Sequence, residues 1–380
     1  MGYVTVTGGR DAIEASTVVG EYFRLHDATE PLAVSEIRSQ LRLLIDRVMG
    51  DAGFYAPGYA ALAVKQSEGD ALEAAFMLRA YRSTLERRHR TLPLDLEDMR
   101  IIRRISSAFR DVPGGQVLGP TTDYAHRLLN FALGGETPES IRAALSRADA
   151  LAEVQEPVAP CPHLSERLRQ EGILPPAPPH DETAPSDVTR EKLVFPASRS
   201  ARLQTLARGE TGVLTALAYS SMRGYGAVHP TVGELRVGAV ALYMEYPYGD
   251  DDGAAYYVGD LLMTEVESIN AAHTDDPDEA APFTLGYGLS FGQNEVKAIA
   301  MSIVDRSLDT EGAAPAQDEE FVLSHIDSVD SMGFVSHLKL PHYVTFQSSL
   351  DRARETEAVR RGNKEASSDD SGVPVVHPAL

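Results

Sequence analysis

Two histidines lie close together in the stretch "SHLKLPHYVTFQ", residues 336–347. The separation of His337 and His342 differs from the i, i+4 spacing that places two metal ligands on one helical face. Pro341, however, keeps the residue before it out of the helical region, so the chain can turn back and bring the two imidazoles together. Such a pair would give Zn²⁺ two ligands, with water, His325 or another chain supplying the rest. Alternatively, both histidines cap helix ends or lie at an interface.

A second stretch, "LGYGLSFGQNEVKAIAM", places glycines between a possible strand and a helix that begins near Gln293. Glycine lets backbone NH groups come close to a phosphate at a helix N-terminus. The candidate substrate-binding residues here are Gly286, Gly288, Gly292 and Asn294. Their spacing is not the dinucleotide fingerprint, so a tight structural turn is an equally good interpretation.

Other motifs give weaker signals. The stretch "VPGGQVLGPTTDYAHRLLNF" is not a P-loop, because Pro120 stands where the lysine belongs. Arginines cluster in "MRIIRRISSAFR" and "RAYRSTLERRHR", which could receive polyphosphate or an acidic partner, or could be solvated or subunit-facing helices. The tripeptide "CPH", Cys161 to His163, could chelate a metal but lies in a proline-rich segment.

Helices and strands must position these residues. The order of helical and strand-like apolar patterns along the sequence predicts an α+β chain. We expect a mainly helical region over residues 1–155, a proline-rich linker or insertion over 156–190 and a mixed α/β region over 191–359. The last segment, 360–380, has little to bury and is predicted to be disordered.

The helical half is predicted from apolar periodicity. One helical face closes at Gly50 and comprises Val34, Ile37, Leu41, Leu44, Ile45 and Val48. A later helix opens with Thr137 as N-cap and Pro138 in its first position, with Ile141 and Leu145 pointing inward.

The C-terminal half mixes strands and helices. "GELRVGAVALYMEYPY" and "AAYYVGDLLMTEVESI" are predicted strands, as are "YVTVTGG" near the start of the chain and "EEFVLSHID". "ARLQTLARGETGVLTALAYSSMRGYG" predicts two helices joined by a turn, and "NEVKAIAMSIVDRSL" predicts one more.

Composition narrows the class of protein. The 380 residues carry a formal net charge of −21, which argues against a broad nucleic-acid surface. The single cysteine excludes an intramolecular disulfide and a self-contained iron–sulfur cluster. The start "MGYVTVTGGRDAIEAS" does not have the basic residues and apolar block of a secretory signal, so we expect the cytoplasm.

Several blocks resemble a known family. They are "YVTVTGGRDAIEA", "ALAVKQSEGDALEAAFMLRAYRSTL", "RRISSAFRDVPGGQVLGPTTDYAHRLLNF" and, most specifically, "FVLSHIDSVDSMGFVSHLKLPHYVTFQ". The chain is similar to the I subunit family (PhnI) of the bacterial carbon–phosphorus lyase core complex. The similarity runs from the first predicted strand to about Arg352, and the linker and tail contribute little to it.

The resemblance implies partners and a reaction. Family members assemble with G, H and J subunits into a two-fold symmetric core used in phosphonate breakdown. With the G and H subunits and an ATPase-like L protein, they displace the purine of MgATP from ribose C1′ by an alkylphosphonate, giving α-ribose 1-alkylphosphonate 5-triphosphate. Alone, a member acts as a nucleosidase, with water in place of the phosphonate. Radical cleavage of the carbon–phosphorus bond belongs to the iron–sulfur J subunit.

The resemblance also implies site residues. In the family, two histidines of the terminal motif bind Zn²⁺ near the J subunit, and they match His337 and His342. Displacement at C1′ requires a carboxylate to stabilise an oxocarbenium-like transition state and an acid for the leaving purine. We expect these to be Glu295 and Asp305, with Asp260 and Glu245 as further candidates. The stretch "GYGAVHPTVGE" adds His229 and Glu234 as a second wall of the site.

Three functions therefore stand after the sequence alone. The first is an enzyme subunit for purine displacement. The second is a zinc-containing scaffold that organises partner chains without chemistry of its own. The third is an independent zinc hydrolase, which would need a full set of internal ligands.

Overall fold

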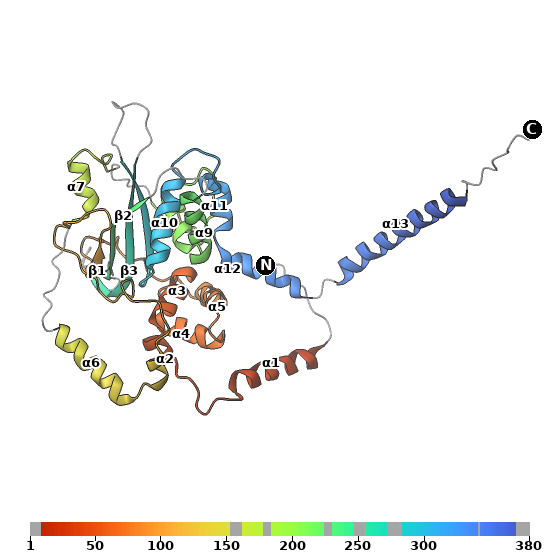
Figure 1. Ribbon diagram of the computed structural model, residues 1–380, viewed down its shortest axis with the longest axis horizontal. Helices are drawn as coiled ribbons and strands as arrows, with labels where there is room; N and C mark the ends of the chain where they lie inside the picture. Colours follow the sequence, from red (N-terminus) through yellow and green to blue (C-terminus); the bar gives the residue numbers. More distant parts are fainter. Residues whose placement is uncertain are drawn as a thin grey trace, which may run out of the picture. The chain divides into compact units, whose positions relative to one another are not determined.

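The structure is a computed structural model that describes residues 9–152, 162–177, 184–223, 230–246, 255–271, 283–340 and 343–369 (Figure 1). The chain divides into two compact units. One unit spans Ala28–Asp330, and the other joins Met1–Asp27 to Ser331–Leu380. Helices surround a single sheet in the larger unit, so the predicted α+β class is confirmed.

The sheet has four antiparallel strands among the described residues, in the order β1-β2-β3-β4. The strands are β1 (Arg100–Ile105), β2 (Thr231–Glu245), β3 (Ala255–Ala271) and β4 (Phe283–Phe291). The predictions for β2 and β3 are confirmed. The arginine-rich segment around β1, interpreted as a helix from its charges, is instead a strand in the N-terminal half, because its Arg103 and Arg104 are buried and paired with carboxylates.

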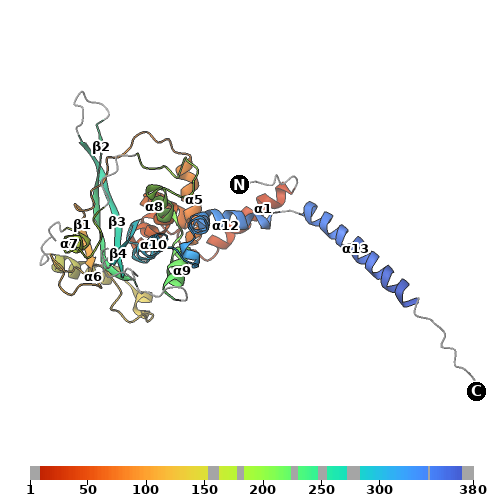
Figure 2. The same cartoon turned by 90° about the horizontal axis from the view of Figure 1, so that it is seen from above.

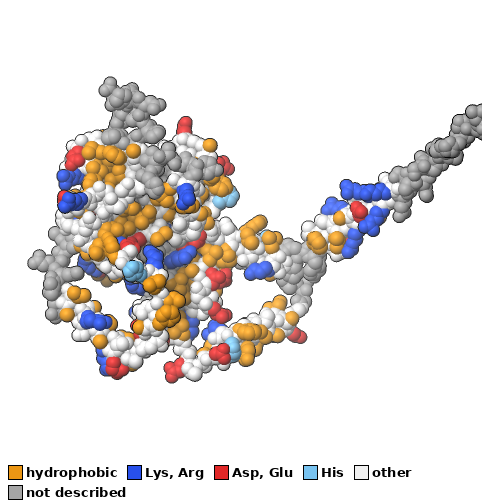
Figure 3. All heavy atoms as spheres, in the orientation of Figure 1, with side chains coloured by type: hydrophobic (Ala, Val, Ile, Leu, Met, Phe, Trp, Pro, Cys, Tyr) orange, Lys and Arg blue, Asp and Glu red, His pale blue; other side chains and the backbone are white. Residues whose placement is uncertain are grey.

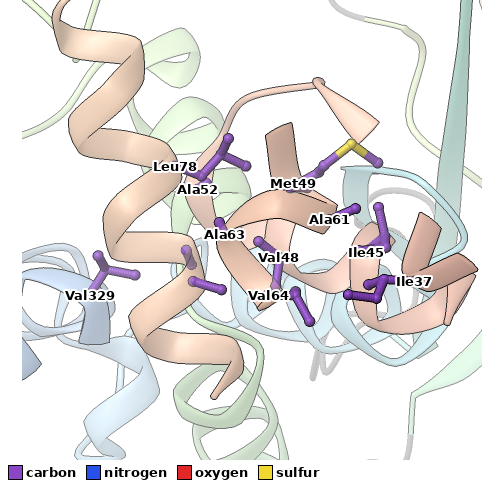
Figure 4. Close-up of a cluster of buried hydrophobic side chains, with 13 residues drawn as sticks. Ile37, Ile45, Val48, Met49, Ala52, Ala61, Ala63, Val64, Leu78 and Val329 are labelled. Atoms are coloured by element: carbon purple, nitrogen blue, oxygen red, sulfur yellow. The ribbon is translucent and has the colours of Figure 1, made fainter. Parts of the chain in front are cut away.

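Four N-terminal helices share one core. They are α2 (Val34–Gln40), α3 (Arg42–Ala52), α4 (Pro57–Gln66) and α5 (Ala71–Ser83). Ile45, Val48 and Leu78 pack together at their centre (Figure 4). The sequence predicts one continuous helical face up to Gly50, and this is wrong at Leu41. The half-exposed Leu41 leaves helical geometry and separates α2 from α3.

The end of α3 also differs from the prediction. Gly50 lies inside the helix, buried against Asn294, and the helix ends at Gly53 with a left-handed φ of 62°. Glycine suits that position because it alone adopts positive φ without steric cost.

A second helical layer covers one face of the sheet. It contains α8 (Arg199–Arg208), α9 (Thr211–Met222), α10 (Glu295–Ser307) and α11 (Glu319–His325). Figure 2 shows α10 against the strands on the side opposite α7 (Leu164–Gln170). The segment "EEFVLSHID" was expected to be a strand, but it forms α11 because Asp318 caps the Phe321 amide and the helix buries Val322.

Helix α6 (Pro138–Ala152) begins where the sequence predicts, with the Thr137 hydroxyl accepting a hydrogen bond from the Ser140 amide. Its apolar side chains are not buried, however. Ile141 is 48% exposed and Leu145 is 60% exposed, so the inward orientation expected for them is wrong.

The smaller unit contains α1 (Arg10–Leu25), the end of α12 (Ser328–Ser336), the short helix η3 (His337–Lys339) and α13 (Tyr343–Asp369). Helix α13 continues to Asp369, and the rest of the expected tail lies outside the described residues, as does the strand predicted in "YVTVTGG". Within the described part of the chain, none of the helices has the length and apolar character needed to cross a membrane.

Candidate active site

A cavity of about 650 Å³ opens in the larger unit at the N-terminus of α10. Four segments line it: the first turns of α3, the loop that follows β1, the start of α9 at Thr211 and the turn into α10 with its first residues. The lining side chains include Arg42, Arg47, Thr121, Thr122, Asp123, Arg127, Gln293, Asn294, Glu295 and Lys297. The volume is within the range of small-molecule sites.

Glu295 is the predicted catalytic residue that the structure places in this cavity. It is the first residue of α10, and its carboxylate accepts a hydrogen bond from Gln293 Nε2 at 2.8 Å. The guanidinium Nε of the buried Arg103 lies 3.1 Å from the same carboxylate oxygen. This carboxylate is therefore held in place by a charged partner and remains only partly exposed.

Arg103 joins Glu295 to a second carboxylate, that of Asp123. A hydrogen bond with Thr121 and the charge of Arg103 lower the pKa of Asp123. Asp123 is thus ionised near neutral pH, and the cavity presents two carboxylates on one arginine. Such a pair can stabilise a developing positive charge.

The cavity also carries basic side chains. They are those of Arg42, Arg47 and Arg127. Arg47 lies 2.9 Å from Glu210, and the charge of Arg127 helps to lower the pKa of Asp123. The N-terminus of α10 adds the partial positive charge of its free backbone NH groups. Arginines and a helix N-terminus are together suited to phosphate oxygens.

Lys297 ties the first turn of α10 to α3. Its ammonium is completely buried, lies 3.0 Å from Asp51 and has its pKa lowered by burial. The pair links α10 to α3 beneath the cavity floor.

The turn into α10 depends on Gly292 and Asn294. Gly292 has φ of 71°, and a Cβ there would lie 2.5 Å from Asp46. The Asn294 amide donates to the carbonyl groups of Asp46 and Phe291, both at 2.7 Å. The predicted turn is therefore present, and of these two residues Asn294 lines the cavity.

Gly286 and Gly288 have a different role from the one expected. Both lie inside β4, where an added Cβ would come within 2.0 Å of the carbonyl oxygens of Ser302 and Ala298. These glycines bring the strand close to α10, and the group their backbone approaches is the helix. The phosphate-binding interpretation is corrected for these two positions.

Asp305 does not line the cavity. Its buried carboxylate binds Arg199 in a bidentate pair and accepts a hydrogen bond from the Tyr287 amide at 3.0 Å. Asp260, on β3, accepts hydrogen bonds from Arg100 of β1 and from Tyr257 of its own strand. Glu245 is exposed at the end of β2. The structure therefore brings Glu295 into the candidate site but none of these three carboxylates.

The predicted histidine sites are only partly described. His229 and His342 lie outside the described residues. His337 begins η3, with its Nδ1 hydrogen-bonded to the Phe334 carbonyl, and His325 ends α11 with its Nδ1 2.8 Å from the Phe321 carbonyl oxygen. A zinc ion on His337 and His342 stays a prediction.

The loop after β1 was not predicted to belong to the site. Its Thr121, Asp123 and Arg127 nevertheless line the cavity. Gly119 holds the loop against β1, since its φ is 62° and a Cβ there would lie 2.5 Å from the Ile102 carbonyl oxygen. The three isoleucines among residues 100–105, a β-branched type enriched in strands, were the signal that a strand leads into this loop.

Comparison with known proteins adds the family. A family model described as "Bacterial phosphonate metabolism protein (PhnI)" matches residues 2–360. The chain belongs to the PhnI family. This confirms the resemblance found in the terminal histidine motif and the N-terminal blocks.

Three relatives match almost the whole chain. A Stutzerimonas stutzeri protein named "Putative C-P lyase subunit protein HtxH" is 52% identical over 94% of this chain and 96% of its own length. The Escherichia coli K12 protein named "Alpha-D-ribose 1-methylphosphonate 5-triphosphate synthase subunit PhnI" is 48% identical over 92% and 96%. A Rhizobium meliloti protein with the same name is 44% identical over 96% and 98%.

Proposed function

We propose that this chain is a cytoplasmic subunit of a carbon–phosphorus lyase complex that displaces the purine of MgATP at ribose C1′ by an alkylphosphonate. The product is α-D-ribose 1-methylphosphonate 5-triphosphate when methylphosphonate is the nucleophile. The names of the PhnI relatives support the subunit role and the reaction. The observation that supports the site is the cavity in which Glu295 faces arginines at a helix N-terminus.

The basic and the acidic side chains of the cavity suit different parts of the substrate. We assign the triphosphate and its Mg²⁺ to Arg42, Arg47 and Arg127, which can pair with phosphate oxygens. The ribose then lies towards Glu295 and Asp123. This orientation places the two carboxylates where positive charge develops at C1′.

In the reaction, a phosphonate oxygen forms a bond to C1′ while the C1′–N9 bond breaks. The bonding electrons leave with the purine, which takes up a proton. Water replaces the phosphonate when the chain acts alone as a nucleosidase. We propose that Glu295 stabilises the oxocarbenium-like transition state, and that Asp305 keeps α10 in place rather than contacting substrate.

A scaffold function is the second candidate, and exposed apolar side chains favour it. One group follows the cavity-lining loop in sequence, where Leu128, Leu129 and Phe131 are 81%, 83% and 87% exposed. Another lies along α1 (Figure 3). Patches of this kind mark partner surfaces. We propose that G, H and J subunits, L protein and a second copy across a two-fold axis bind this chain, with Zn²⁺ on His337 and His342 at an interface.

The test measures, by chromatography, the free adenine released from MgATP. The purified chain is compared with the chain assembled with G and H subunits and L protein, with and without methylphosphonate. Purine displacement predicts adenine from the isolated chain and ribose 1-methylphosphonate triphosphate from the assembly. A correctly assembled complex that releases no adenine would leave the scaffold function.

A further inference from the structure

A group of charged side chains is buried on the face of the sheet opposite α10. Arg104 on β1, Glu234 and Arg236 on β2, and Glu265 and Glu267 on β3 are each at most 7% exposed. They lie on one face because alternate residues of a strand share a face and because the register pairs Glu234 with Glu267 and Arg236 with Glu265. Helix α7 contacts this group, since the Leu164 amide donates to Glu234 and the Ser165 hydroxyl donates to Glu267.

The charges of this group do not cancel. Arg104 lies 2.6 Å from Glu234, and Arg236 lies 2.5 Å from Glu265. Glu267 has no arginine of its own. One of its oxygens accepts the Ser165 hydroxyl at 2.9 Å, but Oε2 has no hydrogen-bond partner although the residue is only 7% exposed. A buried carboxylate left in this way is costly unless a cation or a proton compensates it.

His163 completes the group. It stands directly before α7, and its Nδ1 lies 3.7 Å from Glu234 Oε2 and 3.7 Å from Glu267 Oε2. This nitrogen also has no hydrogen-bond partner. The three atoms lie within 4.8 Å of one another. Ligands held about 2.1 Å from a metal ion are themselves about 3–4 Å apart, so the spacing suits an ion at the centre.

We propose that His163, Glu234 and Glu267 bind one divalent transition-metal ion. Imidazole together with two carboxylates favours Mn²⁺, Fe²⁺ or Zn²⁺ over Mg²⁺, which prefers oxygen ligands alone. The site uses none of the residues of the expected His337 and His342 pair, and it is independent of the purine-displacement proposal. Two of the three ligands were candidates in the sequence, His163 in the "CPH" motif and Glu234 as a wall of the expected site, but Glu267 was not. Cys161 lies outside the described residues.

Arg236 sets the tautomer of His163, and metal binding must change that tautomer. Its Nη2 lies 2.7 Å from His163 Nε2 and, because it can only donate, it places the imidazole proton on Nδ1. A metal on Nδ1 displaces that proton. The ring then turns its new Nε2–H from Arg236 towards Glu265 Oε2, now 3.8 Å away, the kind of carboxylate partner that metal-bound histidines use. The proton thus moves from one ring nitrogen to the other, so metal binding changes the tautomer of His163 without net loss of a proton from the ring.

The test measures Mn²⁺ binding to the full-length chain by electron paramagnetic resonance. The chain is first treated with a chelator, and Mg²⁺ and Zn²⁺ serve as competitors. We expect about one tightly bound Mn²⁺ per chain, displaced by Zn²⁺ but not by an equal concentration of Mg²⁺. The His337→Ala/His342→Ala variant should retain it. Glu267→Gln should weaken binding about tenfold or more, and Glu171→Gln, at the exposed end of α7, should not.

The same variants separate a metal from a proton. If a proton alone compensates Glu267, the glutamine variant keeps the wild-type Tm or raises it, and Mn²⁺ shifts the Tm of neither protein. That result, or equal Mn²⁺ affinity of Glu267→Gln and the wild type, would overturn the proposal. With a metal site, Mn²⁺ raises the Tm of the wild type and not that of the folded variant, as checked by circular dichroism.

Discussion

Gly288→Ala tests whether the β4 glycines pack α10 or approach a ligand. An added Cβ would lie 2.0 Å from the Ala298 carbonyl oxygen, whereas ordinary contact begins at 3.4 Å. Helix α10 would have to retreat by about 1.4 Å, and overpacking of this size costs about 3 kcal/mol. For the unit Ala28–Asp330 that lowers the Tm by about 5 °C. Because Glu295 begins α10, we also expect adenine release to fall about a hundredfold.

The assays are thermal unfolding by circular dichroism and adenine release per folded protein. Gly58→Ala is the matched control, because nothing lies within 4 Å of a Cβ added at Gly58 on α4. Its Tm should stay the same or rise, since alanine favours a helix over glycine. A Gly288→Ala protein with wild-type Tm and weakened ATP binding would refute the packing argument and restore the phosphate-binding interpretation.

Three further predictions follow from buried or shifted charges. Lys297→Met should lower the free energy of unfolding by about 3 kcal/mol, because it removes the nearer cation of the buried Asp51 and leaves only Arg47, 3.6 Å away. Urea unfolding should show that Asp51→Asn in the same chain recovers part of the loss. The hydrogen bond from Thr189 lowers the pKa of Asp187 to about 2, so its contribution to stability is present above about pH 4 and disappears as the pH falls through 2. Asp187→Asn should therefore flatten the fall of Tm in that window, and an unchanged slope would contradict the assignment. Asp305→Asn should lower the Tm but leave adenine release per folded protein within about threefold of wild type, whereas a loss as large as that of a catalytic residue would contradict its positioning role.

Periodicity and turn chemistry were enough to predict much of the fold. The strands β2 and β3 and the helices α8, α9 and α10 follow from local patterns that tertiary packing does not oppose. The errors occur where packing decides. Val322 and Leu323 read as strand residues but bury one side of α11, and the apolar stripe of α6 faces outward in this chain.

The candidate site was harder to predict than the fold. Glu295 and the Gly292 turn could be found because a glycine turn before a helix is a local signal. Asp123 and Arg42 could not, because their place beside Glu295 depends on contacts between segments that are distant in sequence. Glu295 and Asp305 lie on one helix, yet no sequence spacing shows that only the first faces the cavity.

The most direct test of the central claim is adenine release by the assembled complex containing Glu295→Gln. Asp260→Asn is the control, since this carboxylate is bonded to Arg100 away from the cavity. We expect Glu295→Gln to assemble normally and to release adenine about a hundredfold more slowly, with the KM for MgATP nearly unchanged, while Asp260→Asn behaves as wild type. An assembled Glu295→Gln complex with the wild-type rate would place the C1′ chemistry outside this cavity.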